Sequence, residues 1–270
     1  MKRRILLPLA ALLAAALTAC GPAGPEPTPT PTPTAAPLPA PSPTPEPVYV
    51  PPVLSSQRFS QTFTAEDGTE LLSAAYTLPD FENREASAAL TAISAWYTAL
   101  GEDMLSTAAF TAQDASADYE LSGAQDIPFL PGSEEMDFQC TYQNERVISF
   151  SRTFYATIAG TAHPTVLRLG DLFDLVTGEE LTFTQCFTDA IAASEQALRS
   201  VLSSETVAGL TAQGMESARI QAAFQPERFY LTEEGFVFWF QADDLGISGS
   251  PIEVTVPYSA LKEYLVSWIG

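Results

Sequence analysis

The sequence contains few of the residues that most catalytic and metal sites require. Its 270 residues include one histidine, His163, and three cysteines. A serine–histidine–acid triad would need His163 as its base, and a histidine-rich zinc site needs more than one imidazole. The sequence has no EF-hand spacing, no Walker loop and no Gly-x-Gly-x-x-Gly motif, so no motif supports a calcium, nucleotide or dinucleotide site. We therefore expect no cofactor and no bound metal.

The N-terminal apolar run is too short for a transmembrane anchor. Three basic residues at positions 2–4 precede an apolar run of about 13 residues, whereas a membrane-spanning helix needs about 20. Such a basic start with a short apolar core is typical of a secretory signal. The tetrapeptide Leu17-Thr18-Ala19-Cys20 fits a lipobox, in which the cysteine thiol receives a diacylglycerol group. We predict a lipoprotein signal peptide over residues 1–19, lipidation of Cys20, and an anchor on the extracytoplasmic face of the cell membrane.

Proline dominates the residues that follow Cys20, where it makes up 14 of the 32 positions from 21 to 52. Proline has no N–H to donate and fixes φ, so this segment can form neither a helix nor a sheet. We expect residues 20–52 to be a lipidated, disordered linker in extended polyproline-II conformation, which holds the folded part away from the membrane. A proline-rich docking ligand is the alternative, but the basic residues that often flank such ligands are absent.

Basic residues are also scarce. Removal of residues 1–19 takes away three basic residues and no acidic ones, which leaves 9 against 33 and a net charge of −24. Such a surface would repel nucleic acid and anionic lipid headgroups, and it would attract cationic partners at long range. Acidity also favours solubility, and that alternative stays open.

Two cysteines remain once Cys20 is lipidated, which is too few for a disulfide framework, although Cys140 and Cys186 could pair outside the cell. Cys140 alternates in phase with Met136, Phe138 and Tyr142. This pattern predicts that Cys140 points into a core as a small hydrophobic residue.

Residues 53–125 predict a small α+β subdomain. A hairpin over 58–78 would turn at Ala65-Glu66-Asp67-Gly68, because Asp-Gly is a strong turn signal. Pro79 is expected to end its second strand. Apolar residues at every third or fourth position then predict a helix over 83–109, capped by Asp80 or Asn83.

Residues 126–270 predict a second, larger α+β domain. Its expected elements are a hairpin over 136–158 that turns at 143–145, a strand over 165–175 with a turn at Thr177-Gly178-Glu179, a helix from Thr184 whose buried stripe holds Phe187, Ile191, Leu198 and Val201 or Leu202, a hairpin over 229–240 whose second strand is covered on both faces, a strand over 252–256 and a helix over 258–268. The fold class is therefore α+β, with mainly antiparallel sheets, two long helices and a C-terminal helix.

Several short motifs follow one another in the second domain. They are Ala159-Gly160-Thr161-Ala162-His163-Pro164, Asp174-Leu175-Val176-Thr177-Gly178, Leu181-Thr182-Phe183, Leu231-Thr232-Glu233-Glu234-Gly235-Phe236 and Val254-Thr255-Val256-Pro257-Tyr258. Their order resembles the C-terminal domain of RsiV-type extracytoplasmic anti-sigma proteins, a domain of unknown function that also accompanies some peptidoglycan deacetylases. Residues 58–109 are similar to the smaller domain that usually precedes it.

The resemblance implies the exported module alone. RsiV-type proteins have a cytoplasmic sigma-factor-binding segment and a transmembrane helix, and this chain shows neither, nor a deacetylase domain. In RsiV-type sensors the module binds lysozyme, a strongly cationic protein, and the acidic composition of this chain suits such a partner.

We therefore expect a non-enzymatic binding or sensing module that meets an envelope component such as peptidoglycan, or a cationic protein such as lysozyme. An envelope hydrolase is the first alternative, because Asp171 and Asp174 follow His163 within one segment. His163 lies in a turn, where its ring could simply bond to backbone. Adjacent acids such as Glu66-Asp67 lie mostly at turns and give no support for a glycosidase. A purely structural accessory lipoprotein is the second alternative.

Overall fold

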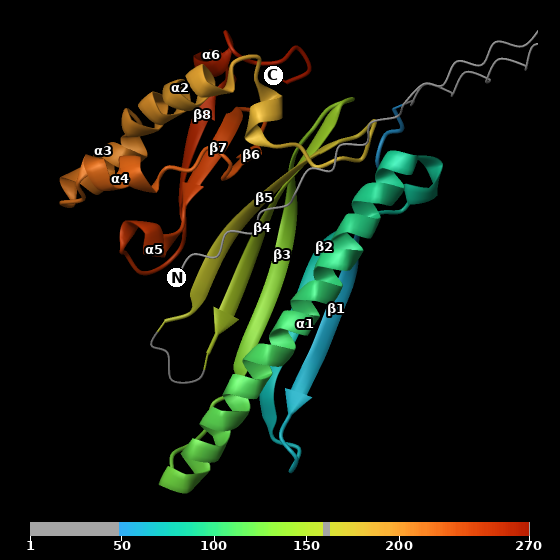
Figure 1. The fold of residues 1–270 in the computed structure, drawn as a ribbon, viewed down its shortest axis with the longest axis vertical. Helices are drawn as coiled ribbons and strands as arrows, with labels where there is room; N and C mark the ends of the chain where they lie inside the picture. Colours follow the sequence, from blue (N-terminus) through green and yellow to red (C-terminus); the bar gives the residue numbers. More distant parts are fainter. Residues whose placement is uncertain (1–48, 159–162, 270) are drawn as a thin grey trace, which may run out of the picture. The chain divides into compact units, whose positions relative to one another are not determined.

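The computed structural model describes residues 49–158 and 163–269 (Figure 1). The predicted signal peptide, Cys20, residues 20–48 of the linker and residues 159–162 of the His163 motif lie outside these described residues. The described residues form one compact unit. The elements in chain order are β1 (Leu54–Thr64), β2 (Glu70–Phe81), the 3₁₀ helix η1 (Arg84–Ala86), α1 (Ala88–Gln125), β3 (Gly132–Gln143), β4 (Val147–Thr157), β5 (Thr165–Asp174), the 3₁₀ helix η2 (Phe183–Cys186), α2 (Ala190–Leu202), α3 (Glu205–Ala212), α4 (Ser217–Ala223), β6 (Phe229–Leu231), β7 (Gly235–Phe240), α5 (Ala242–Leu245), β8 (Ile252–Pro257) and α6 (Tyr258–Leu261).

The α+β class is confirmed, with two sheets. The first is a five-stranded mixed sheet in the order β1-β2-β3-β4-β5, and the second is a three-stranded antiparallel sheet in the order β6-β7-β8. Among the described strands, only the β2–β3 pair is parallel, because α1 returns the chain along the sheet before β3 begins. This pairing makes the first sheet continuous across the expected domain boundary at residues 125 and 126.

The helix expected over 83–109 exists, but both of its predicted ends are wrong. It begins after Ser87, whose side chain accepts the backbone N–H of Ala89, and it continues to Gln125. In its second half the large apolar residues Phe110 and Leu121 are exposed, and the buried residues are Ala108 and Ala112. Alanine has the highest helix propensity and lets the helix approach the sheet closely, so the helix extends further than the larger residues indicate.

Buried alanines also explain the error in the buried stripe predicted for the second helix. Residues 183–186 form a 3₁₀ turn, and α2 begins only after its cap Asp189 and spans 13 residues. Ile191 is 78% exposed, whereas Ala193, Ala197 and Val201 form the buried stripe. The described residues therefore contain one long helix, α1, where two were expected.

Three further details differ from the expectations. The C-terminal helix is a single turn, α6, and the chain beyond it pairs Leu265 with Phe187. Strand β2 continues past Pro79 to Phe81. The register of β3 shifts after Cys140, so Tyr142 contributes to the core on the other side of the sheet from Met136, while Cys140 is half-buried. Cys140 and Cys186 are not joined.

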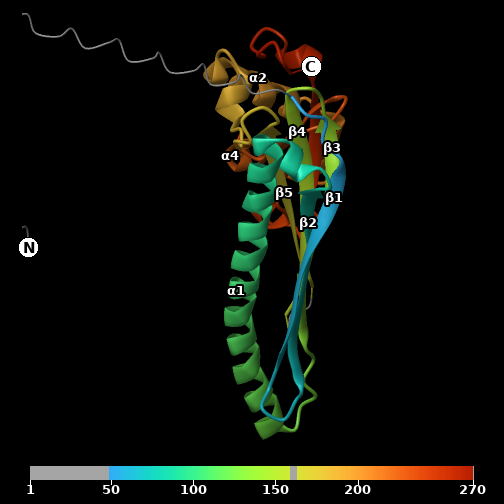
Figure 2. The same cartoon turned by 90° about the vertical axis from the view of Figure 1, so that its right-hand side faces the viewer.

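Different elements cover the two faces of the five-stranded sheet. Helix α1 covers one face, and Figure 2 shows it lying along the strands. The three-stranded sheet and α2 cover part of the other face, where they share a core with Val147 and Leu172. Successive residues of β4 point to opposite faces, so Val147 joins one core and Ile148 the other. The first six residues of β4 are buried, so this part of the strand is covered on both faces.

The two sheets approach closely at Gly170 in β5. A Cβ atom there would lie 2.4 Å from the carbonyl oxygen of Phe229 in β6 and 2.9 Å from the ring of Trp239. Nearby, the Ser149 hydroxyl accepts the backbone N–H of Leu231 at 2.9 Å and lies 3.3 Å from the carbonyl oxygen of Asp171. The hydroxyl therefore satisfies a backbone donor of the buried β6 strand.

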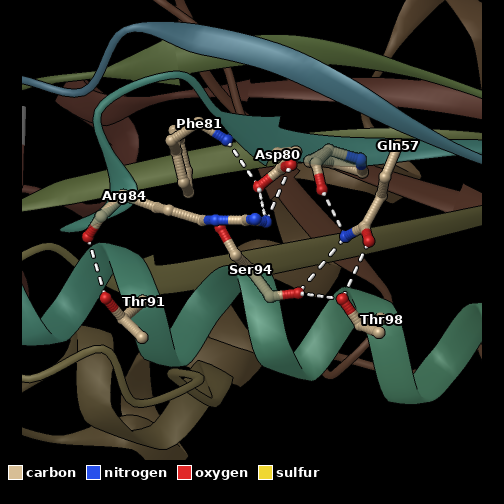
Figure 3. A network of polar contacts seen from close by, with 8 residues as sticks. Gln57, Asp80, Phe81, Arg84, Thr91, Ser94 and Thr98 are labelled. Atoms are coloured by element: carbon tan, nitrogen blue, oxygen red, sulfur yellow. Dashed lines mark hydrogen bonds and ion pairs between the residues drawn. The ribbon is translucent and has the colours of Figure 1, made fainter.

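A polar network fixes the first half of α1 against β1 and β2 (Figure 3). The side-chain amide of Gln57 in β1 donates to the carbonyl oxygens of Pro79 and Ser94, and its oxygen accepts from the Thr98 hydroxyl at 2.8 Å. At the adjoining turn, Arg84 pairs with Asp80 at 3.2 Å. These contacts set the position of the helix over the sheet. Among the described residues, no helix is both long and apolar enough to cross a membrane.

Candidate functional site

The structure does not bring His163 together with the acids that follow it. His163 is exposed, two residues before β5, and lines a shallow cavity with Gln241, Asp243 and Ser248. Six steps along an extended strand, about 20 Å, separate Thr165 from Asp171. Asp171 faces the core under α1, where Phe150 is its strand partner and Tyr97 its hydrogen-bond donor. This geometry gives no support to a hydrolase built from His163 with Asp171 or Asp174.

Asp174 organises the turn that follows β5. Its Oδ1 accepts the backbone N–H groups of Val176 and Thr177, at 2.7 and 3.1 Å, and its Oδ2 pairs with Arg146. Gly178 has a φ of +79°, the left-handed conformation that glycine adopts without strain. The expected tight turn at Thr177-Gly178 is confirmed.

Asp171 belongs to a buried ion pair that the sequence did not indicate. Its two carboxylate oxygens accept Nε and Nη2 of Arg152 at 2.6 and 2.7 Å, and Oδ2 also accepts the Tyr97 hydroxyl at 2.9 Å. The Arg152 guanidinium lies 5.8 Å from the ring centroid of Trp96. Burial disfavours the charged guanidinium, but the charge and hydrogen bonds of Asp171 outweigh it and raise the pKa of Arg152.

Tyr97 completes this pair as a neutral donor. Burial first, and then the negative charge of Asp171, raise the pKa of the Tyr97 hydroxyl well above its usual value. Arg152, Asp171 and Tyr97 come from β4, β5 and α1, so the three side chains join the helix to the sheet.

A groove opens beside this buried pair, between α1 and the sheet. Its volume is about 310 Å³, and most of its lining is apolar. We call it the α1 groove. Its lining residues are Tyr76, Leu100, Met104, Thr107, Glu134, Met136, Arg152, Phe154, Leu167 and Leu169. A mainly apolar cavity with a few converging polar groups is the usual form of a small-molecule site.

The polar groups of the α1 groove differ in how their charge is balanced. Glu134 is 8% exposed, and its Oε2 accepts the Tyr76 hydroxyl at 2.5 Å. Burial and the adjacent Glu134 raise the pKa of Tyr76, so Tyr76 is a neutral donor. The charge of Arg152 is compensated by Asp171, whereas Glu134 has no ion-pair partner among the described residues. The carboxylate of Glu134 is therefore the one charge in the lining of the α1 groove that no other charge balances.

A second surface lies at the C-terminal end of α1. Leu121, Ile127 and Leu130 are 57%, 54% and 69% exposed, and they line a shallow hollow together with Asp118. Tyr119 donates to Asp67 of the β1–β2 turn at 2.6 Å, which brings that turn to the same place. We call this surface the acidic end. Its exposed carboxylates are Glu66, Asp67, Glu70, Asp114, Asp118, Glu120 and Asp126.

The acidic end has no cation in its sequence neighbourhood, because no lysine or arginine occurs between Arg58 and Arg84 or between Arg84 and Arg146. This gap was visible in the sequence, but only the fold shows that the β1–β2 turn and the end of α1 lie together. Apolar side chains exposed among uncompensated carboxylates are a surface suited to another molecule.

The described residues thus combine a long helix over a mixed sheet with a second sheet on part of the opposite face, a groove and an acidic surface. No protein-family model and no curated protein matches the chain. Its fold is similar to the crystal structures of two DUF3298 family proteins. The one from Bacteroides fragilis NCTC 9343 is similar over 80% of this chain and 94% of its own, with a TM-score of 0.57 and 14% identity. The one from Pseudomonas aeruginosa PAO1 is similar over 81% and 96%, with a TM-score of 0.54 and 16% identity.

This similarity confirms, for the fold, the resemblance to the RsiV-like domain family that the order of motifs indicated. At 14% and 16% identity it concerns the fold alone. The α1 groove and the acidic end are observations on this chain.

Proposed function

We propose that this chain is a non-enzymatic binding or sensing module, held by a lipid on Cys20 at the extracytoplasmic face of the cell membrane. Its partner is a cationic protein, with lysozyme as the type of protein that fits. The acidic end is the observation that supports this proposal most directly. Peptidoglycan and a purely structural role are the competing assignments, and neither makes use of a surface that joins carboxylates to exposed apolar side chains.

The charge of the described residues supports a cationic partner. Residues 49–269 contain 9 lysines and arginines against 31 aspartates and glutamates. Six of the nine cations pair with carboxylates within the chain, namely Arg84, Arg146, Arg152, Arg168, Arg199 and Arg228. Most carboxylates are thus left to act on the surroundings, where such a field raises association rates with cations and weakens as salt screens it.

Exposed apolar side chains at the acidic end would keep a bound partner in place, which charge alone does not do. Steering by charge raises the rate of encounter, but residence depends on contacts that exclude water. Leu121, Ile127 and Leu130 offer such contacts next to Asp118 and Asp126. A cationic protein with apolar residues on the same face would use both parts of the acidic end.

Calorimetry with lysozyme tests the proposal. The chain from residue 20 onward, with Cys20→Ser to prevent lipidation, should bind lysozyme at low salt and bind it more weakly at physiological salt. The triple variant D118N/E120Q/D126N should weaken binding about tenfold or more, because close charge pairs across an interface couple by about 1.5 kcal/mol or more.

A matched variant separates the acidic end from net charge. E216Q/E234Q/E263Q removes the same charge from other exposed positions and should weaken binding far less. Equal weakening by the two triple variants would exclude the acidic end as the contact surface. The absence of heat at both salt concentrations would exclude lysozyme as the partner.

A further inference from the structure

We propose that the α1 groove is a binding site for a small amphiphilic amine, a primary alkylammonium ion whose apolar chain lies along the groove and whose charged group meets Glu134. This site is separate from the acidic end and does not depend on the function proposed above. It rests on three observations: a buried carboxylate without an ion-pair partner, an adjacent arginine whose charge is already balanced, and apolar walls.

The charge of the head group follows from the balance inside the groove. Arg152 directs Nε and Nη2 to Asp171, and Nη1 lies 3.5 Å from the sulfur of Met136. An anionic ligand would therefore meet an arginine whose charge is already balanced by Asp171, and it would be repelled by the carboxylate of Glu134. A cation meets one unbalanced carboxylate, and a charge pair in such a partly enclosed place is stronger than in water.

The form of the carboxylate site also favours an ammonium group. The Tyr76 hydroxyl donates to one oxygen of Glu134 and restrains the carboxylate. Glu134 lines the groove, so its other oxygen is the remaining acceptor for a ligand. A primary ammonium has three N–H donors, and the hydroxyl of Thr107, also in the lining, is a further acceptor.

The walls of the groove determine the rest of the ligand. Leu100 and Met104 of α1 face Phe154, Leu167 and Leu169 of the sheet across the groove. A hydrocarbon chain between these side chains would be removed from water, which stabilises the complex in proportion to the apolar area buried. The ligand that suits both parts is an amphiphile, with a cationic group at one end and an apolar chain.

The groove is formed before any ligand arrives. The Arg152–Asp171–Tyr97 contacts join β4, β5 and α1 beneath it, and the Gln57 network fixes the first half of α1. Because the helix and the sheet are already positioned, little binding energy is lost in ordering the site.

Calorimetry with three probes of equal chain length tests this site: octylammonium, octanol and octanoate. The chain from residue 20 with Cys20→Ser should bind octylammonium most tightly, octanol more weakly and octanoate least. Glu134→Gln should weaken octylammonium binding about 10- to 100-fold, the range expected for a hydrogen bond to a charged group. The same variant should leave octanol binding nearly unchanged, since glutamine can still accept the Tyr76 hydroxyl.

Thr107→Trp provides a second test that does not alter the buried groups. Thr107 is an exposed groove residue, so a tryptophan there would cover the groove without entering the core. It should abolish binding of octylammonium and octanol and leave the unfolding temperature near that of the parent chain. Octanoate binding as tight as octylammonium, or octylammonium binding unchanged in both variants, would overturn the proposal.

Two cross-tests keep this site distinct from the proposed lysozyme function. Glu134→Gln should bind lysozyme as the parent chain does, and D118N/E120Q/D126N should bind octylammonium as the parent chain does. A short peptide with one lysine that binds the groove more tightly than octylammonium would replace the small amine with a protein side chain as the occupant, and would overturn the proposal in its present form.

Discussion

The two faces of the five-stranded sheet differ in what covers them and in the polar groups that they bury. On the face towards the three-stranded sheet, phenylalanine rings pack with centroids 4.6–6.5 Å apart. These residues are Phe183, Phe187, Phe229, Phe236 and Phe238. On the face towards α1, aromatic residues pack around Arg152, Asp171 and Glu134, and the α1 groove opens there.

This difference agrees with the proposed binding site on the face towards α1. Burying apolar rings is favourable wherever they fit. Burying charges costs free energy unless they are paired and hydrogen-bonded, and an apolar substitute is often as stable. The charged groups under α1 therefore add little stability that apolar side chains could not supply. Their presence is better explained by the position and charge that they give to the groove.

The largest loss of stability is expected on the apolar face. Phe238 is 1% exposed and contacts the rings of Phe183, Phe229 and Phe236. Phe238→Ala would leave a cavity and should lower the free energy of unfolding by about 3–5 kcal/mol. Chemical denaturation measures this loss. Octylammonium binding to the α1 groove by the folded fraction of this variant should be unaffected. A loss of stability below about 1 kcal/mol would show that the aromatic core does not control stability.

A loss of about 3 kcal/mol is expected from Asp171→Ala, on the face towards α1. The variant leaves the Arg152 guanidinium buried without its counter-charge, and breaking one partner of a buried pair costs about 3–5 kcal/mol. The double variant R152M/D171L removes both charges and should recover most of that loss. A double variant as unstable as Asp171→Ala would mean that the charges stabilise the fold, and the comparison of the two faces would fail.

Sequence patterns predicted strands and turns better than helices. The turn at Asp67-Gly68 lies where expected, and the expected hairpin over 229–240 forms, because glycine and its polar neighbours determine the backbone at both turns. Both long helical predictions failed at positions where alanine is the buried residue, such as Ala112 in α1 and Ala193 in α2. A stripe of alanines has no periodic signal among many other alanines, since burial depends on what packs against them.

The candidate site was less predictable still. Asp171 was noted for its position after His163, but the residues that contact it are Arg152 and Tyr97, 19 and 74 positions away. The parallel pairing of β2 and β3 brings Tyr76 to Glu134, 58 positions apart. No local pattern contains such contacts, because they depend on the order of strands in the sheet.

A smaller effect, with a matched control of opposite sign, is expected where the two sheets meet. Gly170→Ala would place a Cβ atom 2.4 Å from the carbonyl oxygen of Phe229, so the strands must separate and stability should fall by about 1–3 kcal/mol. Gly209→Ala in α3 meets nothing within 4 Å and should stabilise the chain by about 0.5–1 kcal/mol. Thermal unfolding of both variants measures the signs. Stabilisation by Gly170→Ala would show that the sheets are not in close contact.

The smallest effect is expected at the solvent-exposed hydrogen bond between Tyr119 of α1 and Asp67 of the β1–β2 turn. The Tyr119 hydroxyl, and after it the backbone N–H of Thr69, lower the pKa of Asp67. Because the folded-state pKa is depressed, the contact stabilises the fold above the ordinary aspartate pKa of about 3.9, and this contribution is lost as the pH falls through the lower, folded-state value. Tyr119→Phe should raise the pKa of Asp67 towards the ordinary value, measured by NMR titration of its carboxyl carbon, with almost no change in stability at neutral pH. An unchanged pKa would show that the β1–β2 turn and α1 do not meet there, and the acidic end would then be two separate surfaces.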